Sequence, residues 1–184
     1  MTDAAPSKTG TIESSVHLRV FTEADLQLLF RFATEPEFSM PFEWCGYTSP
    51  EKYKRQWQED RFLGDGTRLL AVAETDQPAI GWAMWRDPKM FERIGWCWEI
   101  GMVLAPEHRG RGVGTAAHLL LSRYLFDTTT VNRQCAYTEV GNKAEQRALE
   151  KCNFRVEGQL RDAGFRDGEW RDLLLYARLR DEEA

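Results

Sequence analysis

Apolar residues recur along the chain in two patterns, one with the alternation of strands and one with the spacing of helices. Alternating or continuous apolar runs predict strands over residues 17–21, 68–75, 79–86, 95–104, 133–140, 154–158 and 170–179. Helical spacing and helix-start signals predict helices over residues 22–35, 50–64, 112–126 and 142–152. Residues 38–47 are aromatic and irregular, and we expect a loop there. This order predicts a single α/β domain with one mixed sheet.

The length of 184 residues and the apolar fraction of 42% suit one domain with a substantial core. Residues 1–15 are small and polar, so we expect a disordered tail, with the domain over residues 16–180. No window approaches the roughly 18 apolar residues of a membrane span, and no leader segment is apparent. The four cysteines lack the spacing of metal ligands. We therefore expect free thiols, no metal site and a cytoplasmic protein.

The net charge of −5 limits the kinds of partner that the protein can bind. Positive charge gathers only locally, over residues 108–111 and 143–151. Without a long basic run, a nucleic acid is not an expected partner. A local basic patch on an acidic protein favours a small polyanionic ligand.

A glycine-rich turn joins the strand at residues 95–104 to the helix at residues 112–126. Glycines let backbone amides approach a ligand closely, and amides at the start of a helix converge on an anion site. Arg109 and Arg111 add full charges, and Thr115 adds a hydroxyl group. The spacing fits neither a Walker A loop nor the dinucleotide fingerprint. The turn therefore predicts a phosphate site, with a plain turn bearing a solvated basic face as the alternative.

At these residues the chain resembles the GNAT superfamily of N-acyltransferases. The stretch Arg109-x-x-Gly112-x-Gly114 matches the family signature Gln/Arg-x-x-Gly-x-Gly/Ala between a strand and a helix. Residues 142–161 and 172–179 look like the RimJ/RimL-like branch, which acetylates the N-termini of ribosomal proteins. The resemblance implies a mostly antiparallel mixed sheet of about seven strands, splayed at the cofactor site and flanked by about four helices.

The resemblance also implies acetyl-CoA as the cofactor. The pyrophosphate would lie on the amides of residues 109–115, and the pantetheine would pair like an extra strand with residues 102–104. Asn142 would contact the pantetheine or nearby backbone, with a plain helix cap as the alternative. Arg147 and Lys151 would approach the adenosine phosphates, with a solvated helix face as the alternative. The expected cofactor-binding residues are Met102, Val103, Leu104, Arg109, Gly110, Arg111, Gly112, Val113, Gly114, Thr115, Asn142, Arg147 and Lys151.

Acetyl transfer to an amine needs a base, a polarised carbonyl and a proton for the leaving thiolate. The backbone amides of Val103 or Leu104 are candidates to polarise the carbonyl, with ordinary sheet pairing as the alternative. Glu99 is our candidate base, because a carboxylate in an apolar strand becomes a better proton acceptor. Its alternative role is an ion pair with an arginine on the sheet. Tyr137 is our candidate acid, and a core tyrosine is the alternative.

The acceptor pocket is expected on the loop at residues 38–47 and on the strands beside it. Aromatic walls with few polar groups suit a peptide N-terminus or an amphiphilic amine. Glu35, Glu37 and Glu43 near the loop are placed to attract a cation. The predicted acceptor residues, whose alternative role is filling the core, are Phe42, Trp44, Trp82, Trp85 and Trp98, with Trp96 as a further strand aromatic.

The chain departs from the RimJ/RimL-like branch at two positions that handle protons there. Glu145 stands in place of a serine, and we expect it to form a capping box with Asn142. Gly164 stands in place of an acidic loop residue. These departures leave the acceptor of the acetyl group open.

The sequence thus predicts an enzyme that moves the acetyl group of acetyl-CoA directly to a primary amine of a small molecule or peptide. The alternatives are an N-terminal acetyltransferase of a protein and, in a different class, a catalytically silent acyl-CoA-binding module. A weakly specified base favours α-amines over lysine, because their pKa is lower by roughly two units. We expect no nucleic-acid or membrane partner, and a homodimer is one option for the assembly.

Overall fold

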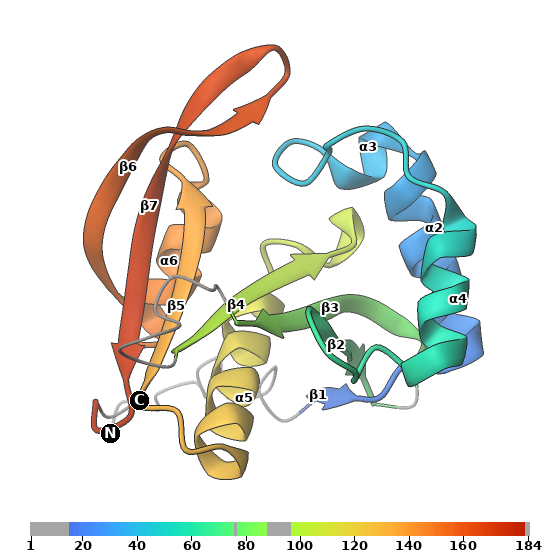
Figure 1. The fold of residues 1–184 in the computed structure, drawn as a ribbon, viewed down its shortest axis with the longest axis horizontal. Helices are drawn as coiled ribbons and strands as arrows, with labels where there is room; N and C mark the ends of the chain where they lie inside the picture. Colours follow the sequence, from blue (N-terminus) through green and yellow to red (C-terminus); the bar gives the residue numbers. More distant parts are fainter. Residues whose placement is uncertain (1–14, 76, 88–96, 183–184) are drawn as a thin grey trace, which may run out of the picture.

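The computed structural model describes residues 15–75, 77–87 and 97–182 (Figure 1). Most of the predicted tail, the start of the strand predicted from residue 95, and Trp96 lie outside the described residues. The strands are β1 (Val16–Arg19), β2 (Arg68–Glu74), β3 (Ala79–Arg86), β4 (Cys97–Leu104), β5 (Arg133–Glu139), β6 (Arg155–Arg166) and β7 (Glu169–Leu179). The helices are α2 (Leu26–Thr34), α3 (Pro36–Ser39), α4 (Pro50–Asp60), α5 (Val113–Thr128) and α6 (Lys143–Lys151), with short 3₁₀ turns η1 (Glu23–Asp25) and η2 (Pro106–His108).

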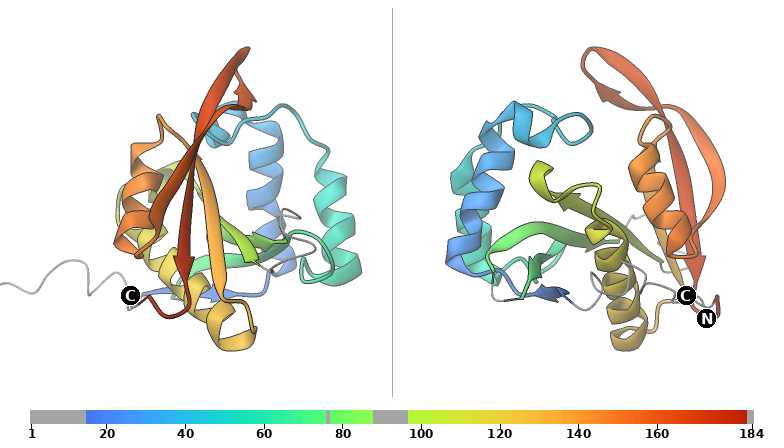
Figure 2. Two further views of the ribbon diagram at one scale, coloured as in Figure 1. Left: turned by 60° about the vertical axis from the view of Figure 1, so that its left-hand side comes forward. Right: turned by 180° about the vertical axis from the view of Figure 1, so that it is seen from behind.

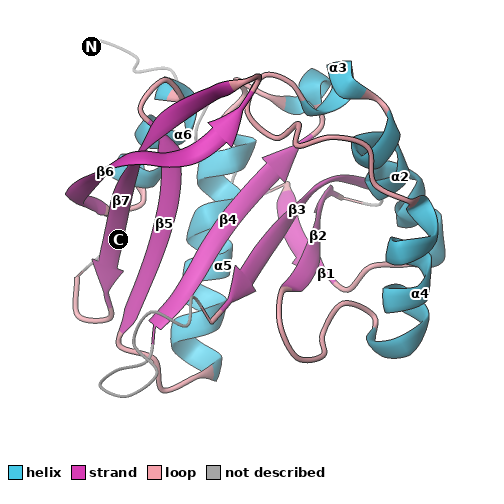
Figure 3. Cartoon of the chain, turned by 45° about the horizontal axis from the view of Figure 1, so that its top comes forward, coloured by secondary structure: helices cyan, strands magenta, loops and turns pink. Residues whose placement is uncertain are grey.

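The strands form one sheet in the order β1-β2-β3-β4-β5-β7-β6. Neighbouring strands are antiparallel except for β4 and β5, which are parallel. This arrangement confirms the predicted α/β fold with a mixed, mostly antiparallel sheet. Among the described residues, β4 and β5 pair only where residues 97–99 face residues 133–135, and they diverge beyond Glu99 (Figure 3). The β5-facing edge of β4 over residues 100–104 is therefore open, and its backbone polar groups can bind a ligand.

Helices cover both faces of the sheet. Figure 2 shows α5 and α6 together on one face, while α2 and α4 lie on the other side of the sheet, beside its first strands. The larger core lies under α5, where Leu121 and Leu125 are fully buried with strand residues such as Val72 and Ile100. This apolar face provides the main driving force that packs α5 on the sheet. In the described part of the chain, no helix is long and apolar enough to cross a membrane.

Two segments differ from the sequence prediction. Part of the region expected to be irregular forms α3, a single turn that begins with Pro36, a residue favoured at the first helical position. The last two strands extend toward each other into a long hairpin, closed by Asp167 and Gly168 with φ values of 54° and 77°. Two left-handed residues are typical of such tight turns. Because most of β6 is exposed at the edge of the sheet, it lacks the apolar alternation that marks a strand.

Candidate active site

The glycine-rich turn adopts a backbone that its sequence favours. Gly110 and Gly112 have φ values of 71° and 85°, in the left-handed region that residues with side chains resist. Gly112 is the N-cap of α5, so the first amides of this 16-residue helix point out of its end. The positive end of the helix dipole and these amides together favour an anion.

A cavity of about 490 Å³ lies beside this turn. Cavities of about 300–1,000 Å³ are typical of small-molecule sites. Its walls come from the turn, the open end of β4, one side of α6 and the loop after α3. The cavity therefore lies where the sheet splays and where the helix amides are exposed.

The side chain of Arg109 fixes the loop after α3 to the end of β4. Its guanidinium donates hydrogen bonds to the carbonyl oxygens of Leu104 at 2.9 Å, Met40 at 2.6 Å and Phe38 at 3.0 Å. Burial lowers the pKa of Arg109, and the nearby carboxylate of Glu43 opposes this effect. The first residue of the motif thus shapes a wall of the cavity by binding backbone carbonyls.

Glu145 carries a carboxylate on the α6 side of the cavity. Asn142 caps α6 by accepting a hydrogen bond from the Glu145 amide at 3.2 Å, as predicted. The Glu145 carboxylate does not reach back to complete the capping box. Instead it lies 2.7 Å from Nε2 of His118, a fully buried residue of α5. The sequence analysis did not identify His118. The pattern that could have identified it is a polar residue at a core-facing position of an otherwise apolar helix.

Glu43 lines the same cavity from the loop after α3. The residue keeps exposed surface, although many protein atoms lie around its carboxyl group. Loss of hydration raises the pKa of its carboxyl group to about 7, with repulsion from Glu145 and Glu139 outweighing attraction by Arg109 and Arg166. Across residues 15–75, 77–87 and 97–182, no side chain forms a hydrogen bond or ion pair with this carboxylate.

The sequence pattern of the acetyltransferase (GNAT) domain matches residues 15–155, which is most of the chain. The chain belongs to the GNAT acetyltransferase family. This membership confirms the predicted acetyl-CoA-dependent N-acetyltransferase and its cofactor, in place of the silent binding module.

Relatives and solved structures agree with this family. YdaF of Bacillus subtilis, provisionally named a ribosomal N-acetyltransferase, is 36% identical over 84 residues, which is 46% of each chain. An L-methionine sulfoximine/L-methionine sulfone acetyltransferase of Salmonella typhimurium is 28% identical over 77% of this chain and 81% of its own length. A spermidine N-acetyltransferase from Vibrio cholerae, solved with CoA and spermine, has a TM-score of 0.77 at 20% identity, covering 91% of this chain and 96% of that chain.

The residues predicted to bind coenzyme A in this GNAT acetyltransferase mostly meet at the cavity. Two side chains do not line it. Val113 is 1% exposed and belongs to the core, and Arg111 forms an ion pair with Glu74 at 3.3 Å. All the other predicted cofactor residues line the cavity, including Asn142, Lys151 and the open end of β4.

The two candidate proton handlers of the acetyltransferase lie outside the cavity lining. Glu99 is 8% exposed, and its carboxylate accepts a hydrogen bond from Arg86 at 2.6 Å. It lies at the closed end of the gap between β4 and β5, where strand pairing stops. Tyr137 lies on β5 opposite Leu175, and burial raises the pKa of its hydroxyl group. The geometry does not bring either side chain to the cavity, and their catalytic roles stay predictions.

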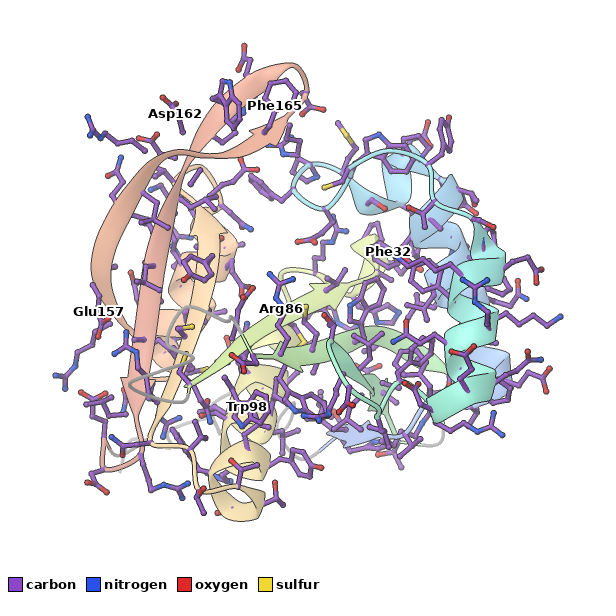
Figure 4. The ribbon with its side chains drawn as sticks, in the orientation of Figure 1. Phe32, Arg86, Trp98, Glu157, Asp162 and Phe165 are labelled. Atoms are coloured by element: carbon purple, nitrogen blue, oxygen red, sulfur yellow. The ribbon has the colours of Figure 1, made fainter. Side chains whose placement is uncertain are left out.

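The five predicted acceptor aromatics do not form one wall. Phe42 lines the cavity, and Trp44 packs against Tyr47 with ring centroids 5.1 Å apart on the same loop. Trp82 packs against Phe32 of α2 at 4.5 Å. Trp85 and Trp98 are buried in the core under α5. Figure 4 shows Trp98 beside α5 and away from Phe32 of α2. Side chains alternate between the two faces of a strand, so Trp82 and Trp85 of β3 face opposite sides of the sheet.

Proposed function

We propose that this acetyltransferase moves the acetyl group of acetyl-CoA directly to a primary amine of a small, positively charged molecule or peptide. The observation that carries this proposal is the polarity of the cavity along α6. Glu145 in the first turn and Lys151 at the last residue both line it. A rise of about 1.5 Å per residue separates these two positions by about 9 Å along the helix axis.

The basic end suits the phosphates of coenzyme A. Arg147 and Lys151 line it together with the glycine-rich turn. At Gly114 an added Cβ would meet only the Leu104 Cδ1 atom, at 3.8 Å, so the space over this glycine belongs to the cavity. When bound, acetyl-CoA supplies the activated acetyl group as a thioester. The pyrophosphate is proposed to bind the turn amides, as an anion at a helix N-terminus does.

The open edge of β4 then orients the rest of the cofactor. Residues 102–104 line the cavity and lack strand partners on the β5 side within the described residues. Their outward amides are proposed to pair with the pantetheine and to polarise the thioester carbonyl. Such donors stabilise the negative charge that develops on the carbonyl oxygen during attack.

The acidic end suits the amine. Glu43 and Glu145 both face the cavity there, and Glu139 is close enough to act on Glu43 electrostatically. Carboxylates in a cavity of low polarity attract an ammonium group and disfavour a carboxylate beside it. An amine without an adjacent acid group is therefore the favoured acceptor.

A thiol-release assay with acetyl-CoA tests this proposal. The panel pairs amines that differ in charge alone: L-methioninamide against L-methionine, and a dipeptide amide against its free acid, with spermidine and L-methionine sulfoximine as further acceptors. We expect kcat/KM to be about tenfold higher for the cationic member of each pair, equivalent to about 1.4 kcal/mol. Equal or faster acetylation of the acidic members would contradict the proposal.

A peptide or protein N-terminus is the second candidate. The observation that favours it is the similarity to YdaF, provisionally named a ribosomal N-acetyltransferase. An α-amine also has a lower pKa than a lysine amine, so more of it is neutral near pH 7. Higher kcat/KM for a folded protein than for its N-terminal peptide would favour this candidate over a small amine.

A further inference from the structure

Glu43 is held in place from two directions. Its backbone N–H donates to the carbonyl oxygen of Ser39 at 3.0 Å. Ser39 is itself buried, and its hydroxyl donates to the carbonyl of Phe32 at 2.8 Å. Just before Glu43 in the chain, Arg109 binds the carbonyl of Met40. The loop therefore presents the Glu43 side chain to the cavity in a defined position, as a catalytic group requires.

The Glu43 carboxylate has no hydrogen-bond or ion-pair partner among the described residues, whereas the carboxylates of Glu145, Glu99 and Glu139 each have one. Glu145 is paired with His118 at 2.7 Å, and Glu99 is paired with Arg86 at 2.6 Å. The Glu139 carboxylate accepts two hydrogen bonds from Arg166 at 2.8 and 2.9 Å. In the described part of the chain, Glu43 alone among these four has no such partner. Its oxygens are thus free to bind a substrate group.

The surroundings of Glu43 also tune its affinity for a proton. Four charged groups from different elements act on it: Glu145 of α6, Glu139 of β5, Arg109 of the turn and Arg166 of β6. Poor hydration, with the two carboxylates, raises the pKa of Glu43 to about 7 against the opposing arginines. A base with a pKa near the working pH combines a useful deprotonated fraction with good proton affinity.

We infer that the Glu43 carboxylate is the general base that takes the proton of the acceptor ammonium group at the acidic end of the cavity. This inference rests on the proposed acetyl transfer to a cationic amine. The ammonium group gives one proton to Glu43, and the freed nitrogen lone pair forms the C–N bond to the acetyl carbon as the C–S bond breaks. The second proton leaves the nitrogen and ends on the thiolate sulfur. The products are the amide and free CoA, and Glu43 releases its proton to solvent.

Glu145 has a different part in this arrangement. Its carboxylate is hydrogen-bonded to a buried imidazole, which fixes its position. It acts on the reaction through Glu43, whose pKa its charge raises, and by attracting the cationic amine. Glu145 is thus a positioning residue, and Glu43 is the group that touches the reacting nitrogen.

The test is Glu43→Gln, compared with Glu59→Gln as a matched control at an exposed position of α4. With an α-amine acceptor at pH 7, we expect Glu43→Gln to lower kcat by about 10²-fold, the usual effect of losing a general base. Calorimetric affinity for acetyl-CoA should stay unchanged. The loss should shrink at pH 9, because an α-amine with a pKa of about 8 is then mostly neutral without help. A structural defect would not be relieved in this way.

The outcomes separate this inference from the proposed function. If the wild-type enzyme acetylates no cationic amine, the proposed function fails. If the wild type is active but Glu43→Gln keeps its rate at pH 7, Glu43 is not the base. A loss of equal size at pH 7 and pH 9 would also overturn the inference, and Glu59→Gln should match the wild type throughout.

Discussion

The Nε2 atom of His118 lies 2.7 Å from a carboxylate oxygen of Glu145 and joins the middle of α5 to the first turn of α6. His118 is fully buried, and its Nδ1 atom has no hydrogen-bond partner among the described residues. With Nε2 protonated, the ring donates to Glu145 and holds this carboxylate at the cavity wall. The charge of Glu145 is thereby kept near Glu43 and near the proposed amine site.

Replacing Glu145 with Gln tests this charge. The change removes the repulsion that raises the pKa of Glu43, so that pKa should fall. Because the base must be deprotonated to act, activity rises with pH through this pKa, and the acidic limb of the kcat/KM profile should move to lower pH. KM for a cationic amine should rise several-fold through the lost attraction, while KM for acetyl-CoA stays near that of the wild type.

Glu145→Asp is the matched control, since it keeps the charge on a shorter side chain. Its acidic limb should stay close to that of the wild type. A limb that moves to higher pH in Glu145→Gln, or that moves equally in both variants, would contradict this electrostatic role.

Arg109→Lys tests the role of the motif arginine. Lysine keeps the charge but cannot donate to the three carbonyls of Leu104, Met40 and Phe38 together. We expect a loss of about 1–3 kcal/mol in the free energy of unfolding, because the carbonyls, two of them in part-buried contacts, lose hydrogen bonds from a charged donor. KM for the amine should also rise, since the loop that carries Glu43 is no longer fixed. Denaturant unfolding and steady-state kinetics measure both effects.

The control for Arg109 is Arg111→Lys in the same turn. Arg111 is half exposed and binds only side chains, those of Glu74 and His108, among the described residues. Its replacement should leave stability and the KM for the amine nearly unchanged. If Arg109→Lys weakens acetyl-CoA binding alone and leaves stability intact, the arginine binds phosphate and does not fix the loop.

The sequence predicted the phosphate side of the site because that side depends on local chemistry. Gly110, Gly112 and the amides after them lie within a few residues of one another, and their spacing alone indicates the backbone shape. The strands of the core were likewise predictable, since burial imposes an apolar pattern on β2 to β5. The part of β6 beyond residue 158 carries no such pattern because it is largely exposed.

The acceptor side could not be predicted in the same way, because it depends on contacts between distant residues. His118 and Glu145 are 27 positions apart, and Arg109 and Met40 are 69 positions apart. Glu99 shows the same limit: its position in an apolar strand suggested a base, but Arg86 on the neighbouring strand occupies its carboxylate. Periodicity places a side chain on a face, whereas its partner depends on tertiary packing.

Asp25 gives a prediction about acid stability. This residue is 2% exposed, and burial alone would raise its pKa. Hydrogen bonds from Arg19, Thr22 and the Ala79 amide outweigh burial and hold the pKa well below its usual range. A lowered folded-state pKa stabilises the fold above the unfolded value of about 3.9. This stabilisation is lost as the pH falls below about 4.

Asp25→Asn should remove most of this stability at pH 7. Breaking a buried ion pair by removing one partner typically costs about 3–5 kcal/mol. The difference from the wild type should shrink as the pH falls below about 4, because the Asp25 carboxylate of the unfolded chain then binds a proton that the folded chain does not yet bind. Asp127→Asn, at an exposed position of α5, is the control and should show no such loss. A pH-independent difference in urea unfolding would exclude the ionic explanation.

Gly81→Ala tests whether the cofactor site depends on the close contact of β3 with the end of β4. An added Cβ at Gly81 would lie 2.2 Å from the carbonyl oxygen of Val103 and 2.6 Å from Cδ2 of Leu104. Because the nearest of these atoms is backbone, β4 must shift to accept the methyl group. Overpacking of this kind typically costs about 1–3 kcal/mol. The shift would also move the open strand edge on which the pantetheine is proposed to lie.

We therefore expect Gly81→Ala to weaken acetyl-CoA binding by calorimetry even at temperatures where the protein stays folded. Gly158→Ala is the matched control, since Gly158 lies in β6 and an added Cβ there meets no atom within 4 Å. That variant should bind acetyl-CoA like the wild type. If Gly81→Ala lowers the melting temperature but leaves acetyl-CoA affinity intact, the end of β4 does not orient the cofactor, because its displacement would otherwise change the affinity directly.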